Sequence, residues 1–382
     1  MSLVFEAPAR AGAVLEIDLD AIVRNWRFLA RRAAPAACAA VVKADAYGLG
    51  AAKVAPALAK AGCRFFFVAT LDEGILLRPL LAEPVEIAVL NGPLPGSAEE
   101  FAAHRLLPVL NDPGQIEDWA RIASCEGAPP ALLHLDTGMA RLGLCEPEFA
   151  SFLEGGGGGN AILWRGFMSH LACAEDPRHP QNALQRCRFL DGLRRFGAVC
   201  TGSDASRGSL ASLAASSGIF LGRDYHFDLV RPGAALYGVN PQPQHPNPMR
   251  QAVRLRGKIV QVREVDRGQA VGYGAAHLMA HQGRLATVAV GYADGWPRSM
   301  SPRGFAKIGG KRVPLIGRVS MDLTIFDVSA IDPALVRPGA FVDLLDEEYG
   351  VDQAAADART IGYEILTALG RRYHRVYHGE AS

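Results

Sequence analysis

The sequence has no excess of either charge, since 40 lysines and arginines stand against 39 aspartates and glutamates, for a net charge of +1. A balance of this kind gives no electrostatic basis for binding nucleic acid or an anionic membrane. No apolar run is long enough to cross a bilayer, and residues 1–14 lack the basic and then apolar pattern of a signal peptide. We therefore expect a cytoplasmic, soluble protein.

Cysteine pairs with the spacing of a zinc site or a redox motif are also missing. The seven cysteines are odd in number, contain no C-x-x-C pair and all lie within the first 200 residues. Free thiols in a reducing compartment, with no metal site, are the expectation.

A G-x-G-x-x-G turn is absent too, which counts against an open doubly wound sheet, the main alternative for alternating strands and helices. Helical segments alternate with apolar strand candidates and are clearest at 20–32, 71–80, 113–123 and 181–195. The strand candidates fall at 39–42, 65–68, 85–90, 106–110, 131–135, 165–169, 208–214 and 227–230. Eight such units in about 230 residues match the size of a (β/α)8 barrel of the TIM type.

The pattern changes after residue 238. Residues 240–248 are rich in proline, glutamine and asparagine, as in a linker. Beyond them, short runs of alternating polarity are separated by glycine and proline, at 252–262, 285–290, 313–316, 323–328 and 341–345. They predict a compact β domain with one helix at 360–369. The expected fold is thus an α/β barrel at 1–240 and a mostly-β domain at 241–382, with the strand at 15–18 open to joining either.

Lys43 stands at the most informative point of the chain. An apolar strand ends at this lysine, a turn with glycine follows, and residues 51–61 predict a helix that Gly62 ends. An α/β fold presents a reactive amine in this way, and a desolvated lysine loses its proton more easily and forms a Schiff base with an aldehyde. A lysine that extends from a strand end into solvent is the commoner alternative.

Three further clusters lie at the expected carboxyl ends of barrel strands, where barrel enzymes keep their sites. Arg141 offers a planar fork for a carboxylate, although a surface arginine is equally compatible with its cluster. His170 could relay protons, but a lone histidine is more often a satisfied neighbour of the core. Small residues at 212–218 and 228–238 would let the backbone approach a phosphate.

Seven motifs in this order form a specific set, although each is weak alone. They are AVVKADAYGLG (40–50), LDTGMARLG (135–143), MSHLACAED (168–176), FDLVRPGAALYG (227–238), VGYGAAH (271–277), VGYADGW (290–296) and GRVSMD (317–322). From about Leu15 to its end, the chain resembles the alanine racemase family. Its members are pyridoxal 5'-phosphate (PLP) enzymes with a barrel and a β domain.

The resemblance implies a homodimer with shared active sites that interconverts L-alanine and D-alanine. Lys43 would hold PLP through a Schiff base and act as one base, and Tyr273 of the partner subunit would act as the other. Tyr47, Ser216, and the backbone at Gly233 and Ala234 would hold the phosphate. The remaining implied contacts are Arg231 at the pyridine nitrogen, His170 between Tyr273 and Arg231, Arg141 and the partner's Met321 on the substrate carboxylate, and Tyr292 and Asp322 at the entry.

Elementary chemistry agrees with two bases. Racemisation needs a base on each face of one α-carbon, because a single base tends to return the proton to its own side. Free tyrosine and lysine have pKa values of about 10, above the range where a base works best at neutral pH. Nearby cations such as Arg231 should favour the phenolate of Tyr273 and the neutral amine of Lys43. An arginine at the pyridine nitrogen keeps its own proton and should weaken the ring as an electron sink.

Two positions depart from the family pattern. His134 stands where many relatives carry a carbamylated lysine that orients the substrate-binding arginine, so another group or an anion would have to support Arg141. Near the carboxyl end, Arg371 aligns with a tyrosine that contacts the phosphate in relatives, and Tyr373 lies two residues further on. Both stay open as phosphate contacts.

Other PLP proteins give alternative interpretations. A decarboxylase of similar architecture would lack the role of Tyr273 and would usually carry an acidic group in place of Arg231. A PLP carrier is typically a barrel alone, which residues 250–382 oppose. Broad-specificity racemases of the family tend to be exported, so the lack of a signal favours alanine. We expect a supply of D-alanine for peptidoglycan, although breakdown of D-alanine is an alternative that sequence leaves open.

Overall fold

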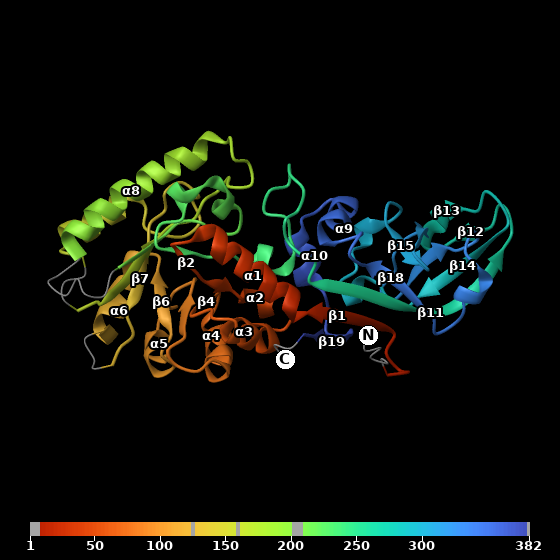
Figure 1. Ribbon diagram of the computed structural model, residues 1–382, viewed down its shortest axis with the longest axis horizontal. Helices are drawn as coiled ribbons and strands as arrows, with labels where there is room; N and C mark the ends of the chain where they lie inside the picture. Colours follow the sequence, from red (N-terminus) through yellow and green to blue (C-terminus); the bar gives the residue numbers. More distant parts are fainter. Residues whose placement is uncertain (1–7, 124–126, 158–160, 201–208, 380–382) are drawn as a thin grey trace.

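The computed structural model describes residues 8–123, 127–157, 161–200 and 209–379. The molecule is elongated, and a ring of strands and helices lies beside a second, largely β part (Figure 1). Gly208, at the start of the strand expected at 208–214, lies outside the described residues, as do Cys125 and part of the glycine run at 155–159.

Parallel strands form the wall of the ring in chain order. They are β2 (Ala37–Cys38), β3 (Ala40–Val41), β4 (Phe65–Val68), β5 (Glu86–Val89), β6 (Leu107–Leu110), β7 (Ala131–His134), β8 (Trp164–Met168), β9 (Leu210–Ser212) and β10 (Leu229–Val230). Their side chains are almost all buried, which explains why each strand is a continuous apolar run in the sequence.

The ring closes through β2 and β3, which are two halves of one strand interrupted at Ala39. The β3 half pairs with β4, and the β2 half pairs with β10. The Ala39 N–H donates to the Val230 carbonyl oxygen at 2.9 Å across this seam, and a bridge between Ala215 and Arg231 joins β9 to β10. The expected barrel is therefore confirmed.

Helices cover the outside of the barrel. They are α1 (Leu19–Ala33), α3 (Ala51–Lys60), α4 (Leu71–Leu77), α5 (Ala98–Ala103), α6 (Pro113–Ala123), α7 (Glu146–Glu154) and α8 (Pro180–Cys200). Asp18 starts α1 by accepting the Ala21 N–H at 2.8 Å. The buried residues of α1 recur at helical spacing and include Ile22, Trp26 and Leu29. The segments α5 and α7 are short and escaped the sequence analysis.

The second part is one eight-stranded sheet in the order β14-β17-β16-β15-β18-β11-β1-β19, in which β14 also pairs with β11 and closes a smaller barrel. The strands are β1 (Ala13–Asp18), β11 (Val253–Val265), β14 (Gly283–Val288), β15 (Phe305–Ile308), β16 (Lys311–Ile316), β17 (Thr324–Asp327), β18 (Phe341–Leu345) and β19 (His374–His378). A separate two-stranded ribbon comprises β12 (Ala270–Val271) and β13 (His277–Leu278). The strand expected at 15–18 lies in this sheet, between β11 and β19.

The helix predicted at 360–369 is confirmed as α10 (Gly362–Ala368), but the expectation that it is the single helix near the end is wrong, because α9 (Val351–Ala358) also follows β18. The sequence of α9 is rich in alanine, which favours a helix but leaves only a faint apolar stripe to recognise. The Gly350 N–H donates to the Gln353 side chain at 3.3 Å and so fixes the start of the helix.

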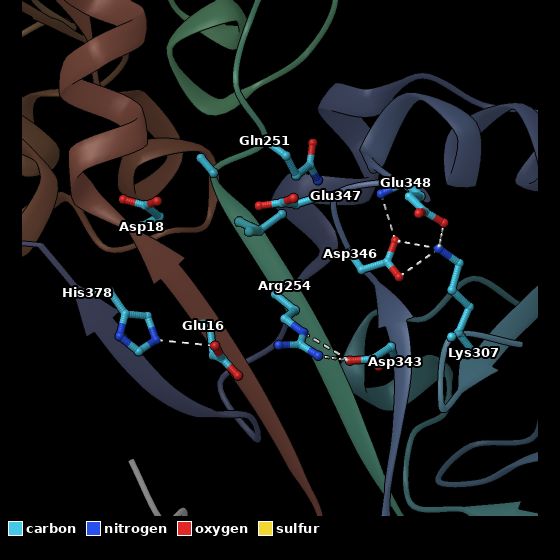
Figure 2. A pocket seen from close by; sticks show the side chains of 13 residues that line it. Glu16, Asp18, Gln251, Arg254, Lys307, Asp343, Asp346, Glu347, Glu348 and His378 are labelled. Carbon is cyan, nitrogen blue, oxygen red and sulfur yellow. Dashed lines mark hydrogen bonds and ion pairs between the residues drawn. The ribbon is translucent and has the colours of Figure 1, made fainter. Parts of the chain in front are cut away.

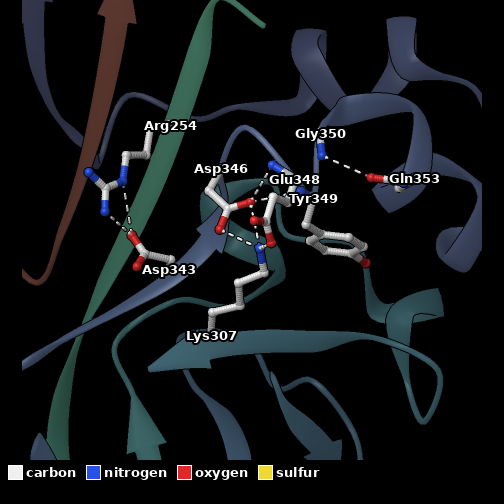
Figure 3. A network of polar contacts seen from close by, with 8 residues as sticks. All are labelled: Arg254, Lys307, Asp343, Asp346, Glu348, Tyr349, Gly350 and Gln353. Carbon is white, nitrogen blue, oxygen red and sulfur yellow. Dashed lines mark hydrogen bonds and ion pairs between the residues drawn. The ribbon is translucent and has the colours of Figure 1, made fainter. Parts of the chain in front are cut away.

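A buried lysine ties the sheet to this helical segment (Figure 3). The ammonium group of Lys307, on β15, lies 2.9 Å from Asp346 and 2.6 Å from Glu348, both just after β18. The next residue, Tyr349, donates its hydroxyl to Asp357 of α9 at 2.6 Å. Two carboxylates around one buried ammonium offset its loss of hydration, so the pairing fixes where the chain leaves β18.

Among the described residues, no helix combines the length and apolar character that crossing a membrane requires.

Candidate active site

The turn after Lys43 has an unusual backbone. Ala44, Asp45, Ala46 and Tyr47 all have φ of 54° or 55°, in the left-handed region. For residues other than glycine this conformation costs about 1–2 kcal/mol each. The turn is closed by hydrogen bonds such as the one from the Gly48 N–H to the Ala44 carbonyl oxygen, at 2.7 Å. Strain of this kind persists only where surrounding groups fix it, and it is a feature of functional sites.

Two carboxylates anchor the turn, Glu73 from outside it and Asp45 from within it. The Ala44 N–H donates to Glu73 of α4 at 2.6 Å, and Asp45 accepts the Ala51 N–H at the start of α3 at 2.7 Å. The turn is thus anchored to the helices on both sides of it. Glu73 was not identified from the sequence, although Thr70 and Glu73 have the spacing of a capping box.

The residues predicted to hold a phosphate lie together at the carboxyl ends of the strands. The Ser216 hydroxyl accepts the N–H groups of Gly233 and Ala235 at 3.0 and 3.2 Å. A side chain at Gly233 would stand 2.3 Å from the Tyr47 hydroxyl, so only glycine lets that hydroxyl approach. Ala234 begins a short 3-10 helix (Ala234–Tyr237) in the same cradle.

Arg231 follows β10 and is buried, with 3% of its surface exposed. Its guanidinium donates to the Ser212 hydroxyl and, at 2.7 Å, to the Ser169 carbonyl oxygen. Burial lowers the pKa of Arg231 to about 10, which leaves it cationic at neutral pH. A fixed positive charge therefore lies inside the mouth of the barrel.

Two histidines beside this charge are held neutral. Burial, followed by the nearby Arg231, lowers the pKa of His134 to about 3 and that of His170 well below its ordinary value. The His134 Nδ1 lies 2.8 Å from the Asn111 side-chain oxygen, while the Asn111 amide nitrogen donates to two carbonyl groups. Since that oxygen accepts, Nδ1 carries the hydrogen and Nε2 of His134 keeps a lone pair.

The lysine itself is half-buried. Burial and the positive charge of Arg141 lower the pKa of Lys43, and Glu73 opposes them. The charges of Lys43 and Arg141 also lower the pKa of His170, so all of these groups share one end of the barrel. A lysine with a lowered pKa is the kind that acts as a nucleophile or base.

Arg141 is exposed at the entrance, on the loop after β7. The Asp136 carboxylate organises this loop by accepting the N–H groups of Gly138, Met139 and Ala140 at 2.8–2.9 Å. The guanidinium is thereby carried on a defined loop while its charged end stays available to an anion.

The remaining predicted residues, Tyr273, Tyr292, Met321 and Asp322, form an exposed surface that we call the β-domain patch. Tyr273 is 72% exposed and Met321 is 54% exposed. Asp322 pairs with Arg372 at 2.7 Å, and the same arginine pairs with the buried Asp294 at 2.8 Å. The ribbon of β12 and β13, which flanks Tyr273, lies at the end of the molecule away from the barrel (Figure 1). Within one chain, Tyr273 and Lys43 are therefore not brought together.

The two residues near the carboxyl end that were left undecided as phosphate contacts differ in burial. Arg371 is exposed, whereas Tyr373 is buried and its pKa is raised, first by burial and then by Asp294. A third aromatic residue, Tyr363, has its ring centre 6.2 Å from that of Tyr47. Its place beside the phosphate cradle depends on α10 packing against the turn, a tertiary contact with no local signal in the sequence.

A cavity of about 530 Å³ lies elsewhere, between β1, β11 and the segment after β18 (Figure 2). Most of its carboxylates are already paired: Glu16 with Arg256, Asp343 with Arg254, and both Asp346 and Glu348 with Lys307. None of the predicted site residues lines it. The chemistry of the molecule is therefore assigned to the barrel mouth rather than to this cavity.

Comparisons with known proteins match the chain in two parts. A family model described as alanine racemase, N-terminal domain, matches residues 17–241, and one described as alanine racemase, C-terminal domain, matches residues 252–377. The alanine racemase of Rhodospirillum rubrum is 50% identical over 372 residues, 97% of each chain. A catabolic alanine racemase of Mesorhizobium japonicum is 46% identical, over 97% of this chain and 94% of that relative.

Solved structures agree with these relatives. Alanine racemase from Bartonella henselae, with covalently bound pyridoxal phosphate, matches with a TM-score of 0.90 and 41% identity, over 96% of this chain and 100% of that one. Alanine racemase from Streptomyces lavendulae matches with a TM-score of 0.90 and 32% identity, over 98% of both chains.

Proposed function

This chain belongs to the alanine racemase family, and we propose that it uses PLP to interconvert L-alanine and D-alanine. The observation that carries the proposal is the barrel mouth, where a lysine of lowered pKa, a backbone cradle and a buried cation lie together. The relatives named alanine racemase, one of them solved with covalently bound pyridoxal phosphate, support the same reaction.

The donor set at the barrel mouth fits PLP. Lys43 supplies the amine, and Tyr47, Ser216 and the backbone at Gly233 and Ala234 suit a phosphate, since the cradle excludes any side chain at Gly233. Arg231 would meet the ring nitrogen, with the neutral His170 beside it. When bound, PLP draws electrons from the substrate and makes its α-hydrogen acidic.

The two bases come from different surfaces in this proposal. Lys43, whose lowered pKa makes the neutral amine available, takes or returns the proton on one face of the α-carbon. Tyr273 of the partner subunit acts on the other face. Because Tyr273 is exposed and lies away from its own barrel, a homodimer with shared sites supplies what one chain lacks.

Substrate binding follows the same division. Arg141 at the entrance and the backbone of the partner's Met321 receive the alanine carboxylate, while Tyr292 and Asp322 line the way in. The domain boundary is proposed between residues 240 and 241. In the cell, the enzyme would act in the cytoplasm, where its five described free thiols fit a reducing compartment, and would supply D-alanine for peptidoglycan.

The first test is incubation of the purified protein with PLP and L-alanine in heavy water. Chiral chromatography should find L-alanine and D-alanine in near-equal amounts, and mass spectrometry should find deuterium at the α-carbon of both. Ethylamine would instead indicate a decarboxylase. A deuterated L form without any D form would mean that only one base works.

A second test addresses the shared site. Lys43→Ala and Tyr273→Phe chains should each be inactive alone. When the two are refolded together in equal amounts, half of the dimers are mixed and each mixed dimer has one intact site. Activity should therefore return to about a quarter of the wild-type value. If the mixture is no more active than its parents, both bases belong to one chain or the site is not shared.

The biosynthetic role is tested in cells. Deletion of the gene should make growth depend on added D-alanine, and loss of wall cross-linking should follow its removal. Growth without D-alanine, together with failure to use D-alanine as a nitrogen source, would instead assign the enzyme to breakdown.

A further inference from the structure

We propose that Glu73 is a positioning residue, whose carboxylate fixes the left-handed turn after Lys43 and thereby sets the position and charge of the lysine amine. The inference rests on the proposed role of Lys43 and deepens it. Glu73 lies on α4, outside the motifs that carry the family resemblance.

The carboxylate joins the ends of two neighbouring barrel strands. Its Oε1 accepts the Ala44 N–H at 2.6 Å, directly after Lys43 and β3. Its Oε2 accepts the Ala69 N–H at 2.7 Å and the Thr70 N–H at 3.3 Å, directly after β4. Since β3 and β4 pair in the barrel, one side chain ties both loops at the carboxyl end of the sheet.

Glu73 is itself held in place. Its N–H donates to the Thr70 hydroxyl at 3.4 Å, which completes a capping box at the start of α4. The start of α4 is therefore fixed, and the Ala69 N–H holds the carboxylate against the loop after β4. Asp45, the carboxylate next to Ala44 in the sequence, accepts the N–H of Ala51 at the start of α3 instead.

The Ala44 N–H is well placed to donate to an anion. It opens a turn of four non-glycine residues at positive φ, and the exposed N–H groups at the start of a turn carry partial positive charge. A carboxylate at this point stabilises the strained conformation. Without it, the backbone that carries Lys43 is free to relax toward right-handed or extended geometry.

The same negative charge acts on the amine. Three charged or titratable groups face Lys43: Arg141 from the loop after β7, His170 from the end of β8, and Glu73 from α4. Burial and Arg141 lower the pKa of Lys43, and Glu73 is the group that raises it. Removal of the Glu73 charge should therefore lower that pKa further.

The decisive variant is Glu73→Gln, which loses the charge and keeps one acceptor oxygen for the Ala44 N–H, while its NH2 group replaces the oxygen that accepts from Ala69 and Thr70. The apoprotein is mixed with PLP over a range of pH, and the rate of Schiff-base formation is followed by absorbance, without substrate. The pH at which the rate reaches half of its maximum should fall by about one pH unit, because the neutral amine of Lys43 then persists to lower pH. Asp72→Asn, which removes an exposed charge on the same helical turn, should leave that pH unchanged.

The positional part is tested with Glu73→Ala, which removes the acceptor as well. Visible circular dichroism of the bound PLP should weaken, and kcat should fall about tenfold or more while KM for alanine changes little, since Arg141 lies on another loop. Thermal unfolding identifies a chain that fails to fold, and in that case Glu73→Gln carries the test alone.

The outcomes separate this inference from the proposed function. If Lys43→Ala captures PLP as the wild type does, the proposed function fails. If Lys43 captures PLP but Glu73→Gln behaves like Asp72→Asn, only the role of Glu73 is overturned.

Discussion

The barrel mouth and the β-domain patch differ in how a single chain treats their polar groups. At the mouth, Arg231 and Ser216 are buried and every contact described above is made within the chain. In the patch, Tyr273 and Met321 stand largely exposed. One half of the proposed site is thus fixed by folding, whereas the other is an exposed surface that would meet a second copy in the proposed dimer.

This difference separates stability from activity. Substitutions at the mouth remove buried hydrogen bonds or charges and should reduce both. Substitutions in the patch remove groups that contribute little to the folded chain, so they should reduce activity and leave unfolding almost unchanged.

Tyr273→Phe should give the largest effect and tests the patch most directly. The hydroxyl is lost from an exposed ring, so the melting temperature and PLP content should stay as in the wild type, while racemisation falls by about 10²–10⁴-fold. Exchange of the α-hydrogen in heavy water should survive for one enantiomer, through Lys43. Near-normal racemisation would remove Tyr273 from the mechanism, and the β-domain patch would then have no catalytic role to compare with that of the barrel mouth.

Ser216→Ala should affect both properties. Two buried N–H groups lose their acceptor, and each unsatisfied group costs about 1–3 kcal/mol of the free energy of unfolding. PLP affinity should fall as well, because Gly233 and Ala235 would no longer be held in place. Ser299→Ala, at an exposed position, is the matched control for denaturant unfolding. Equal stability of the two variants would contradict the structural role of Ser216.

The neutral His134 predicts a dependence on pH. Its folded pKa of about 3 lies below its ordinary value, so between the two values the unfolded chain binds a proton that the native chain does not. Stability should therefore fall as pH falls, by about 1.4 kcal/mol per pH unit for this group. The free energy of unfolding, measured with denaturant at several pH values, should change less steeply with pH for His134→Gln than for the wild type. An unchanged slope would mean that His134 is protonated in the fold.

Asp322→Asn should give the smallest change. Asp322 pairs with Arg372 at the surface, and exposed ion pairs of this kind contribute about 1 kcal/mol or less. Arg372 also keeps its partner Asp294. Calorimetry should find a melting temperature close to that of the wild type. A large drop would show that the patch has a structural role and would weaken the distinction between the two regions.

The sequence identified much of the fold because the barrel strands are buried on both faces and read as apolar runs. The family resemblance, rather than a local pattern, grouped Tyr47, Ser216 and Gly233, and the structure brings these three residues together at one end of the barrel. The left-handed backbone at residues 44–47 could not be foreseen. Alanine and tyrosine do not favour positive φ, and only the surrounding contacts impose it.

The other omissions have a similar origin. Glu73 approaches Ala44 through tertiary structure, and a helix-capping signature says nothing about a second acceptor role. The short strand β19 depends on β1, a partner distant in the chain, rather than on its own pattern. By contrast, β15 forms a hairpin with β16 around Gly309 and Gly310, a local turn signal that the sequence interpretation did not use. Local residues thus predict the elements, whereas long-range pairing decides what lies next to the lysine.

The position of β1 between β11 and β19 has a consequence for synthesis on the ribosome. β1 is made first, but its neighbours at residues 253–265 and 374–378 emerge much later. The barrel strands, which pair with near neighbours in the chain, can assemble while β1 still waits with both edges unpaired. We therefore expect the nascent chain to carry an assembled barrel wall before α10 and β19 contact the turn after Lys43 and before the second sheet is complete.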